Sequence, residues 1–258
     1  MDSNVDHQFT IADLDFVVPC TWEGSRDQLH ISDEFAQGEG HPGRLFSGTA
    51  GLALVIAQLS RAEGWEPPHR LSWQFNAPIY LGNEVVYRTR SLSNDSRQIE
   101  VTVGDHSVAS GEIWTRPSGD QPRLPDSGAE ITRLTRTLGN GDRDLFGWWT
   151  SKSVGQLDLP AAEQPWPVLI LIASGLVGNL QQFAAGDLSA VLRAYDWSFV
   201  RAPQVGETIV ISLTGLDCRR SNSKPDWTVC TASLILRGGG DMIATSSFTV
   251  LCRGEPRL

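Results

Sequence analysis

The chain has little cysteine, little lysine and no long hydrophobic run. Its longest apolar stretch, VLILIA at 168–173, is far shorter than the ~20 residues of a transmembrane helix, so no membrane span is predicted. The stretch MDSNVDHQF at the amino end is polar and acidic, unlike a signal peptide. Basic residues number 21 against 30 acidic ones, and the net charge of −9 excludes a typical nucleic-acid-binding surface. We therefore expect a cytoplasmic protein without nucleic-acid or membrane partners.

Several motifs that carry chemistry are also absent. None of the four cysteines lies in a CxxC pair or at ligand spacing from a histidine: Cys20, Cys218, Cys230 and Cys252. This pattern favours reduced cysteines in the core or in strands, and it predicts neither a metal nor another cofactor. No G-x-S-x-G segment occurs, and RGGGD at 237–241 lacks the strand, helix and lysine of a phosphate loop.

Short motifs occur twice in the same order. SGTAG at 47–51 and SGLVG at 174–178 each open an apolar stretch. WQFNAPIYLG at 73–82 and WSFVRAPQVG at 197–206 share W-x-F-x6-G with an internal proline, and a β-rich run follows each. This repetition predicts that the 258-residue chain is two copies of one unit.

Each copy combines a helix with several strands. Apolar residues recur at i, i+3, i+4 and i+7 in the first copy, namely Leu52, Val55, Ile56 and Leu59. They predict a half-buried helix over 48–63, and a second helix is expected near 168–185. Alternating residues downstream predict strands, and RGGGDM at 237–242 predicts a hairpin turn.

The copies are separated by RPSGDQPRLPDSG at 116–128, which is rich in proline, glycine and serine. We expect an N-terminal unit at 1–117, a linker at 118–127 and a C-terminal unit at 128–258. A helix beside an antiparallel sheet, duplicated, is an α+β fold.

The residues around His30 resemble those of a known family. His30 is followed by DEFA, a glycine-rich approach leads to SGTAG, and F-x-x-P-x-x-x-G-[ND]-E begins at Phe75. These features are similar to the MaoC-like hydratase and dehydratase group of the hotdog fold, and FVRAPQVGET at 199–208 looks like the matching half of a double hotdog. The resemblance covers most of the chain, although each motif is short. It implies two long helices, each wrapped by a curved antiparallel sheet, and acyl-thioester ligands. Such a chain pairs its two sheets within a monomer, and the alternative of a homodimer is left open.

The resemblance implies proton chemistry in one apolar cavity between the copies. Removing water from a 3-hydroxyacyl thioester needs a base at the α-carbon, an acid for the hydroxyl and donors for the enolate oxygen. The imidazole of His30 suits the proton step. Asp27 is the expected orienting or acid partner, and the Gly48 N–H at a helix start suits the oxyanion. Ser47 is expected to cap that helix and to contact substrate.

Each of these residues also has an ordinary structural interpretation. The family pattern has an aspartate five residues before the histidine, where this chain has Ser25, so Asp27 serves only if the loop is shortened. His30 is alternatively a packed loop histidine, and Asp27 a solvated turn residue. Gly48 is alternatively small so that helix and sheet approach closely. The segment before the second helix has no histidine, so at most one site per chain is expected.

Three further residues are candidates for the pocket. His41, in EGHPGR, is a second acid or base or simply a turn residue. Trp148 and Trp149, two of nine tryptophans, precede the second helix. They either fill the second site or line an acyl tunnel.

These observations favour a dehydratase- or hydratase-like lyase. Its substrate would be a 3-hydroxyacyl or enoyl thioester of CoA or an acyl carrier protein, in polyketide- or fatty-acid-type metabolism. One alternative is a pocket with decayed acid–base chemistry that binds a polyketide-like substrate and steers a cyclisation. Another is a hotdog thioesterase, with water activated by Asp27, Asp33 or Asp158.

Overall fold

The computed structural model describes residues 6–24, 28–63, 68–116, 129–153, 166–185 and 190–253. The first half contains β1 Asp6–Thr10, α1 Asp13–Val17, α2 Cys20–Glu23, α3 Gln28–Ile31, α4 Asp33–Gly38, β2 Leu45–Phe46, α5 Gly48–Glu63, β3 Arg70–Phe75, β4 Ile79–Tyr80, β5 Glu84–Ser93, β6 Ser96–Val103 and β7 His106–Trp114. The second half contains β8 Glu130–Thr137, α6 Asn140–Ser153, α7 Trp166–Ala185, β9 Ala190–Phe199, β10 Thr208–Arg220, β11 Trp227–Gly238 and β12 Asp241–Arg253. The expected linker at 118–127 lies outside the described residues.

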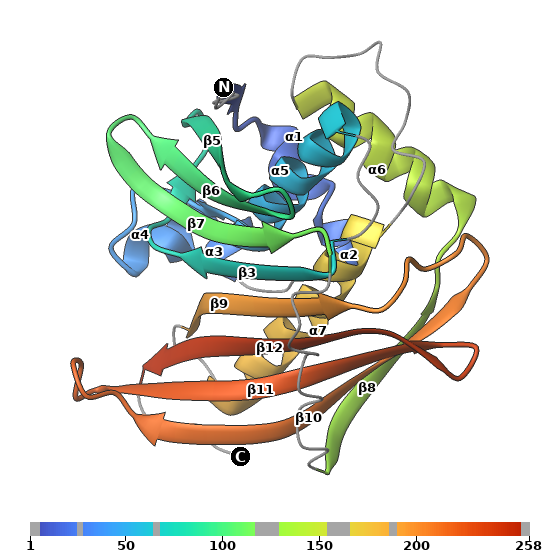
Figure 1. Ribbon diagram of the computed structural model, residues 1–258. Helices are drawn as coiled ribbons and strands as arrows, with labels where there is room; N and C mark the ends of the chain where they lie inside the picture. Colours follow the sequence, from blue (N-terminus) through green and yellow to red (C-terminus); the bar gives the residue numbers. More distant parts are fainter. Residues whose placement is uncertain are drawn as a thin grey trace.

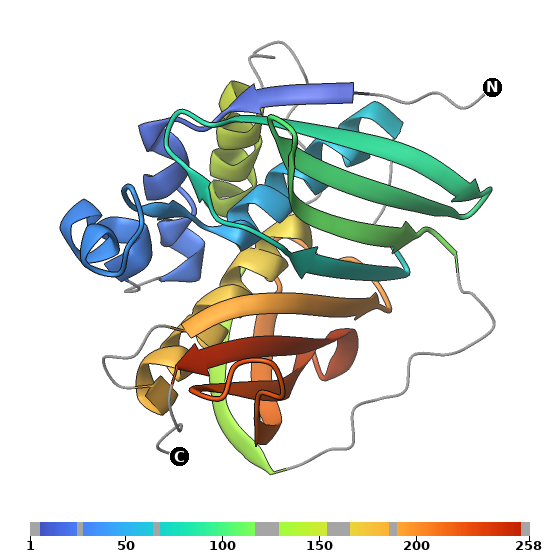
Figure 2. The ribbon, with the colours of Figure 1, turned by 90° about the vertical axis from the view of Figure 1, so that its left-hand side faces the viewer.

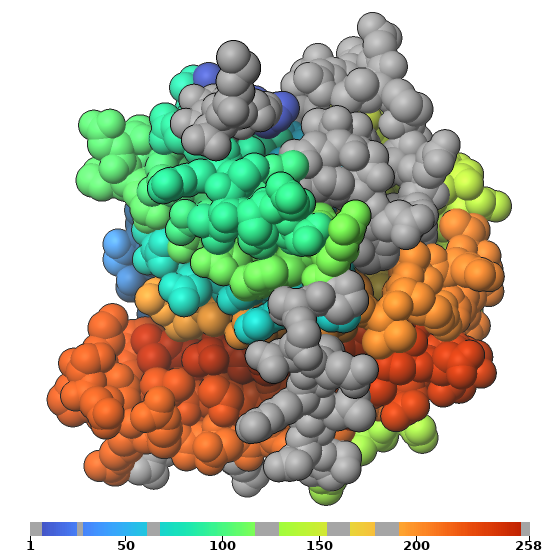
Figure 3. Space-filling view, viewed as in Figure 1, coloured from blue at the N-terminus to red at the C-terminus, as the bar shows by residue number. Residues whose placement is uncertain are grey.

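One antiparallel sheet runs through both halves. Its order is β1-β5-β6-β7-β3-β9-β12-β11-β10-β8, so each half contributes five strands and the halves meet at β3 and β9 (Figure 1). In this central pair Leu71 lies opposite Trp197, and Trp73 lies opposite Tyr195. The two W-x-F segments therefore occupy the two central strands, one in each half. In the space-filling view the first half lies above the second on this face (Figure 3).

The helices α5 and α7 pack on one side of this sheet and contact each other (Figure 2). The sequence predicts a half-buried helix over 48–63, and α5 occupies those residues, but the half-buried expectation is wrong. Leu54, on the face opposite the expected stripe, is as buried as the stripe itself. The sheet covers one side of α5 (Figure 2), and α6 and α7 also contact this helix, so it is buried nearly all round. Within the described ranges, no helix is both long and apolar enough to cross a membrane.

The two S-G-x-x-G segments do not occupy equivalent positions. Gly48 is the first residue of α5, whereas Gly175 lies well inside α7. The expectation that each S-G-x-x-G segment opens an apolar stretch therefore holds for the first segment and is wrong for the second. The longer apolar run before Ser174 is already helical, because α7 begins at Trp166.

The hairpin expected at 237–242 is present between β11 and β12. Gly238 pairs with Asp241, and Gly239 and Gly240 have φ values of 59° and 94°. Two successive residues at positive φ suit the right-handed twist of the flanking strands, and glycine adopts that conformation without steric cost.

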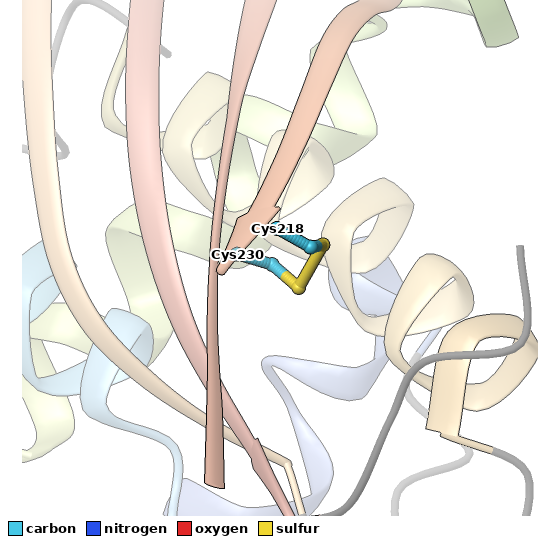
Figure 4. Close-up of a disulfide and its surroundings, with 2 residues drawn as sticks. All are labelled: Cys218 and Cys230. Carbon is cyan, nitrogen blue, oxygen red and sulfur yellow. A yellow bond between two sulfur atoms is a disulfide. The ribbon is translucent and has the colours of Figure 1, made fainter. Parts of the chain in front are cut away.

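The expectation that all four cysteines are reduced is wrong for one pair. Cys218 of β10 and Cys230 of β11 form a disulfide (Figure 4). They lie directly opposite each other in the ladder, with Cα atoms 4.2 Å apart, so strand pairing brings the two sulfur atoms together. Cys20 and Cys252 are free. The spacing of cysteines along the chain gives no sign of this pairing because it depends on the register of the two strands.

Candidate functional site

A cavity of about 230 Å³ lies where the start of α5, the middle of α7 and the strands of the first half meet. Its walls are largely apolar and include Phe9, Leu52, Val55, Trp73, Val85 and Val101. Val191 and Arg193 of β9 also line it and are exposed, so they mark its solvent side. The cavity thus uses residues of both halves.

Four of the expected site residues line this one cavity: His30, His41, Ser47 and Gly48. Asp27 lies outside the described residues. Trp148 and Trp149 are not among the lining residues. The structure therefore brings together the residues around the start of α5 and leaves the tryptophan pair elsewhere.

His30 lies on α3 and is half-buried. Its Nδ1 is 2.8 Å from the carbonyl oxygen of Leu45. A carbonyl can only accept, so Nδ1 carries a proton and donates it to this bond. In the neutral ring, Nε2 then carries the lone pair that a base uses.

Ser47 caps α5, as the sequence predicts. Its Oγ accepts from the N–H of Ala50 at 3.3 Å, and its carbonyl oxygen accepts from the N–H of Gly51. The same hydroxyl donates to Oε1 of Glu23 at 2.7 Å. Ser47 thus links the positive end of α5 to a carboxylate that the sequence analysis did not single out.

Gly48 leaves room for an aromatic ring. A Cβ at this position would lie 2.6 Å from Cδ1 of Phe75, a residue of β3. The close approach of helix and sheet, one of the two interpretations of Gly48, is therefore present. Gly48 also lines the cavity, so the second interpretation stays open.

Glu23 is the lining residue that the sequence analysis missed. It ends α2 and is only 5% exposed. Burial raises the pKa of the neighbouring Cys20 thiol, and the Glu23 carboxylate raises it further. Burial also raises the pKa of the Tyr195 hydroxyl, an effect that Ser174 opposes and the charge of Glu23 reinforces. Nothing in TWEGS at 21–25 indicates burial of its glutamate, because the cover comes from α5 and α7.

The helices α5 and α7 meet through polar side chains beside Glu23. The hydroxyl oxygens of Thr49 and Ser174 are 2.9 Å apart, and both residues line the cavity. One position further on, a Cβ at Gly175 would lie 1.8 Å from the carbonyl oxygen of Glu23. The glycine therefore allows α7 to lie against α2 (Figure 1).

His41 lies near the outer part of the site. Its Nδ1 is 3.1 Å from the Tyr80 hydroxyl, and the two rings are in tilted contact. Burial raises the pKa of Tyr80, which therefore remains a neutral partner for the imidazole at physiological pH.

Neither Trp148 nor Trp149 lines the cavity, so the interpretation of the pair as lining residues does not apply to it. Trp148 on α6 is 46% exposed, and the Lys152 ammonium lies 5.3 Å from its ring. Trp149 is fully buried, and its indole N–H donates to Oδ1 of Asp15 at 2.7 Å. Successive residues of a helix point in different directions, so only one of the two faces the core. Trp149 fills the space between α1 and α6 instead of lining the cavity.

Among the described residues, no three of histidine, cysteine, aspartate or glutamate lie close enough together to hold a metal ion.

We expect a methyl group at Gly175 to destabilise the protein. Because its Cβ would overlap the Glu23 carbonyl oxygen, Gly175→Ala has to move α2 away from α7. Such overpacking typically costs about 1–3 kcal/mol of unfolding free energy. Gly141→Ala is the matched control, since a Cβ at this α6 position meets nothing within 4 Å. We expect the control to be neutral or stabilising by up to about 1 kcal/mol. Urea unfolding measures both, and equal values would contradict the close contact.

Comparison with known proteins identifies the fold. No protein-family model matches the chain, and no curated protein matches its sequence. A structure described as a MaoC domain dehydratase from Chloroflexus aurantiacus J-10-fl has a TM-score of 0.68 at 12% identity, covering 100% of this chain and 96% of that one. A conserved Mycobacterium tuberculosis protein with a double hotdog fold has a TM-score of 0.66 at 12% identity, covering 98% and 95%. A MaoC-like dehydratase from Phytophthora capsici has a TM-score of 0.54 at 11% identity, covering 96% and 95%. At these identities the likeness is one of fold, and the chain therefore has a double hotdog fold.

Proposed function

We propose that this protein is a hydro-lyase that interconverts a 3-hydroxyacyl thioester and an enoyl thioester. The observation that carries the proposal is a single apolar cavity lined by an imidazole, a buried carboxylate and the start of a long helix. The reaction needs proton-transfer groups and donors for the enolate oxygen, and these groups are of those kinds. The MaoC-like dehydratases of the same fold support this assignment by analogy.

In the proposed reaction His30 moves the proton at the α-carbon. Its Nδ1 is held by the Leu45 carbonyl, which orients the ring and leaves the Nε2 lone pair as the base. Polarised donors stabilise the enolate oxygen that forms as the α-proton leaves. The first-turn N–H groups of α5 suit this task, because they have no partner within the helix and lie at its positive end. Gly48 supplies the first of them.

The remaining walls fit a thioester ligand. Leu52, Val55 and Val101 provide an apolar surface for an acyl chain. The exposed Arg193 on the solvent side suits the phosphate of CoA or of a carrier-protein arm. We place the protein in the cytoplasm, in polyketide- or fatty-acid-type metabolism, where such thioesters are intermediates.

Mass spectrometry of the intact thioester tests the proposal. The purified protein is incubated with enoyl and 3-hydroxyacyl thioesters of short, medium and long chain, each on CoA and on a carrier protein. We expect gain or loss of one water on an intact thioester. Release of free thiol would instead support a thioesterase. No change with any of these substrates would support a binding pocket that steers another reaction.

A further inference from the structure

We propose that Glu23 is the second proton-transfer residue of this site, acting on the oxygen at the β-carbon. This inference rests on the proposed function, which requires one proton transfer at the α-carbon and another at the β-oxygen. His30 is assigned to the first. Asp27, expected from the sequence as its partner, lies three residues away from His30 and outside the described residues, whereas Glu23 is placed in the cavity wall.

The burial of Glu23 is unusual for a carboxylate. Glutamate is rarely buried to 5% exposure unless other groups hold it, because removing a carboxylate from water is costly. Here Oε1 accepts from the Ser47 hydroxyl at 2.7 Å, and Ser47 is itself bonded to the first turn of α5. The carboxylate is thus fixed beside the helix start at which the enolate oxygen is expected.

The backbone of Glu23 is held as well as its side chain. The absence of a side chain at Gly175 lets α7 pack against the Glu23 carbonyl. Gly24, the next residue, has a φ of 55° and ends α2, which fixes the direction in which Glu23 leaves the helix. These contacts come from three helices and place one carboxylate at the junction of the two halves.

The proton balance of the reaction follows from this placement. In hydration, the Glu23 carboxylate takes a proton from water as the oxygen bonds to the β-carbon, and protonated His30 delivers its proton to the α-carbon. One C–O bond and one C–H bond form, and the C=C double bond is lost. In dehydration, neutral His30 takes the α-proton, and protonated Glu23 gives its proton to the departing hydroxyl, which leaves as water.

This assignment has a defined pH signature in the hydration direction. Hydration requires Glu23 to be ionised, so the rate falls as pH falls through the pKa of this group. It also requires His30 to be protonated. The profile of kcat/KM is therefore a bell whose acidic limb belongs to Glu23.

Glu23→Gln tests the inference, because the amide oxygen still accepts from Ser47 while the group no longer carries a proton. We expect kcat/KM for hydration to fall about 10²–10⁴-fold and the acidic limb to disappear. Glu34→Gln, on an exposed residue of α4, is the matched control and is expected to leave rate and profile unchanged. Asp27→Asn is measured in parallel. If Glu23→Gln does not fold, Glu23→Asp replaces it, with an expected lower rate and the acidic limb retained, because a misplacement of about 1 Å costs up to about 10²-fold.

Several outcomes would overturn the inference. A wild-type rate in Glu23→Gln would exclude proton transfer by this residue. If kcat/KM of Glu23→Gln falls equally at every pH and the acidic limb remains, the role of Glu23 is structural. Loss of the limb in Asp27→Asn alone would assign the step to Asp27. In these cases the hydro-lyase function stands, whereas absence of water addition and removal in the wild-type protein rejects the function and the inference together.

Discussion

Replacing His30 with glutamine is expected to lower water addition and removal about 10²–10⁴-fold, the usual range for loss of a proton-transfer group. An amide does not take up the α-proton at neutral pH, so the chemical step is lost even where the substrate still binds. Stability is expected to change by about 1 kcal/mol or less, because the ring is only half-buried and its hydrogen bond to the Leu45 carbonyl is a neutral one. The measurement is kcat and KM on the thioester found active, with thermal unfolding alongside.

The control for this variant is His106→Gln. His106 lies at the start of β7 and is exposed, so neither activity nor stability is expected to change. Full turnover in His30→Gln would reject the acid–base lyase. The proposal of a pocket that binds a polyketide-like substrate without proton transfer would then replace it.

Truncating Trp149 to alanine is expected to be the most destabilising of the changes considered. The side chain is fully buried against Trp22 and Phe146, and truncation of a buried tryptophan typically costs about 3–5 kcal/mol. The change also removes the indole N–H that donates to the buried carboxylate of Asp15. Chemical denaturation gives the free energy of unfolding directly.

Trp148→Ala is the matched change on the adjacent residue. Trp148 is 46% exposed, and its loss is expected to change stability by about 0.5 kcal/mol or less. Because neither tryptophan lines the cavity, KM is expected to stay at the wild-type value in both variants at temperatures where they are folded. A raised KM in either variant would show that the tryptophan contributes to substrate binding.

The sequence by itself determined features that depend on near neighbours in the chain. Ser47 marks the start of α5 because a cap and the first-turn N–H groups lie within a few residues of one another. The turn at 237–242 follows from three consecutive glycines, and two of them adopt positive φ. The sequence also predicted a β-rich run after each W-x-F segment, and β5 and β10 lie there. It did not predict that the W-x-F segments themselves form the central pair β3 and β9.

Tertiary structure decided which faces are buried. The expected alternation in β11 runs through Val229, Thr231, Ser233 and Ile235. The buried face consists instead of the intervening residues Thr228, Cys230, Ala232, Leu234 and Leu236. The buried set is also the more apolar one, because Thr231 and Ser233 lie in the other, and packing against the helices makes this difference decisive. Packing against α6, α7 and the sheet likewise decided that α5 is buried nearly all round.

The site itself depends most strongly on contacts between distant residues. The loop sequence indicated His30, Ser47 and Gly48, which lie close together in the chain and line one cavity. Glu23 lies in the wall of that cavity because Ser47 bonds to its carboxylate and Gly175 allows α7 to pack against its backbone. The Cys218–Cys230 disulfide likewise depends on the register in which two strands pair. A local hydrogen bond depends on a few neighbouring residues. Burial of the Glu23 carboxylate depends on residues as distant in the chain as Gly175, and only the folded chain brings these together.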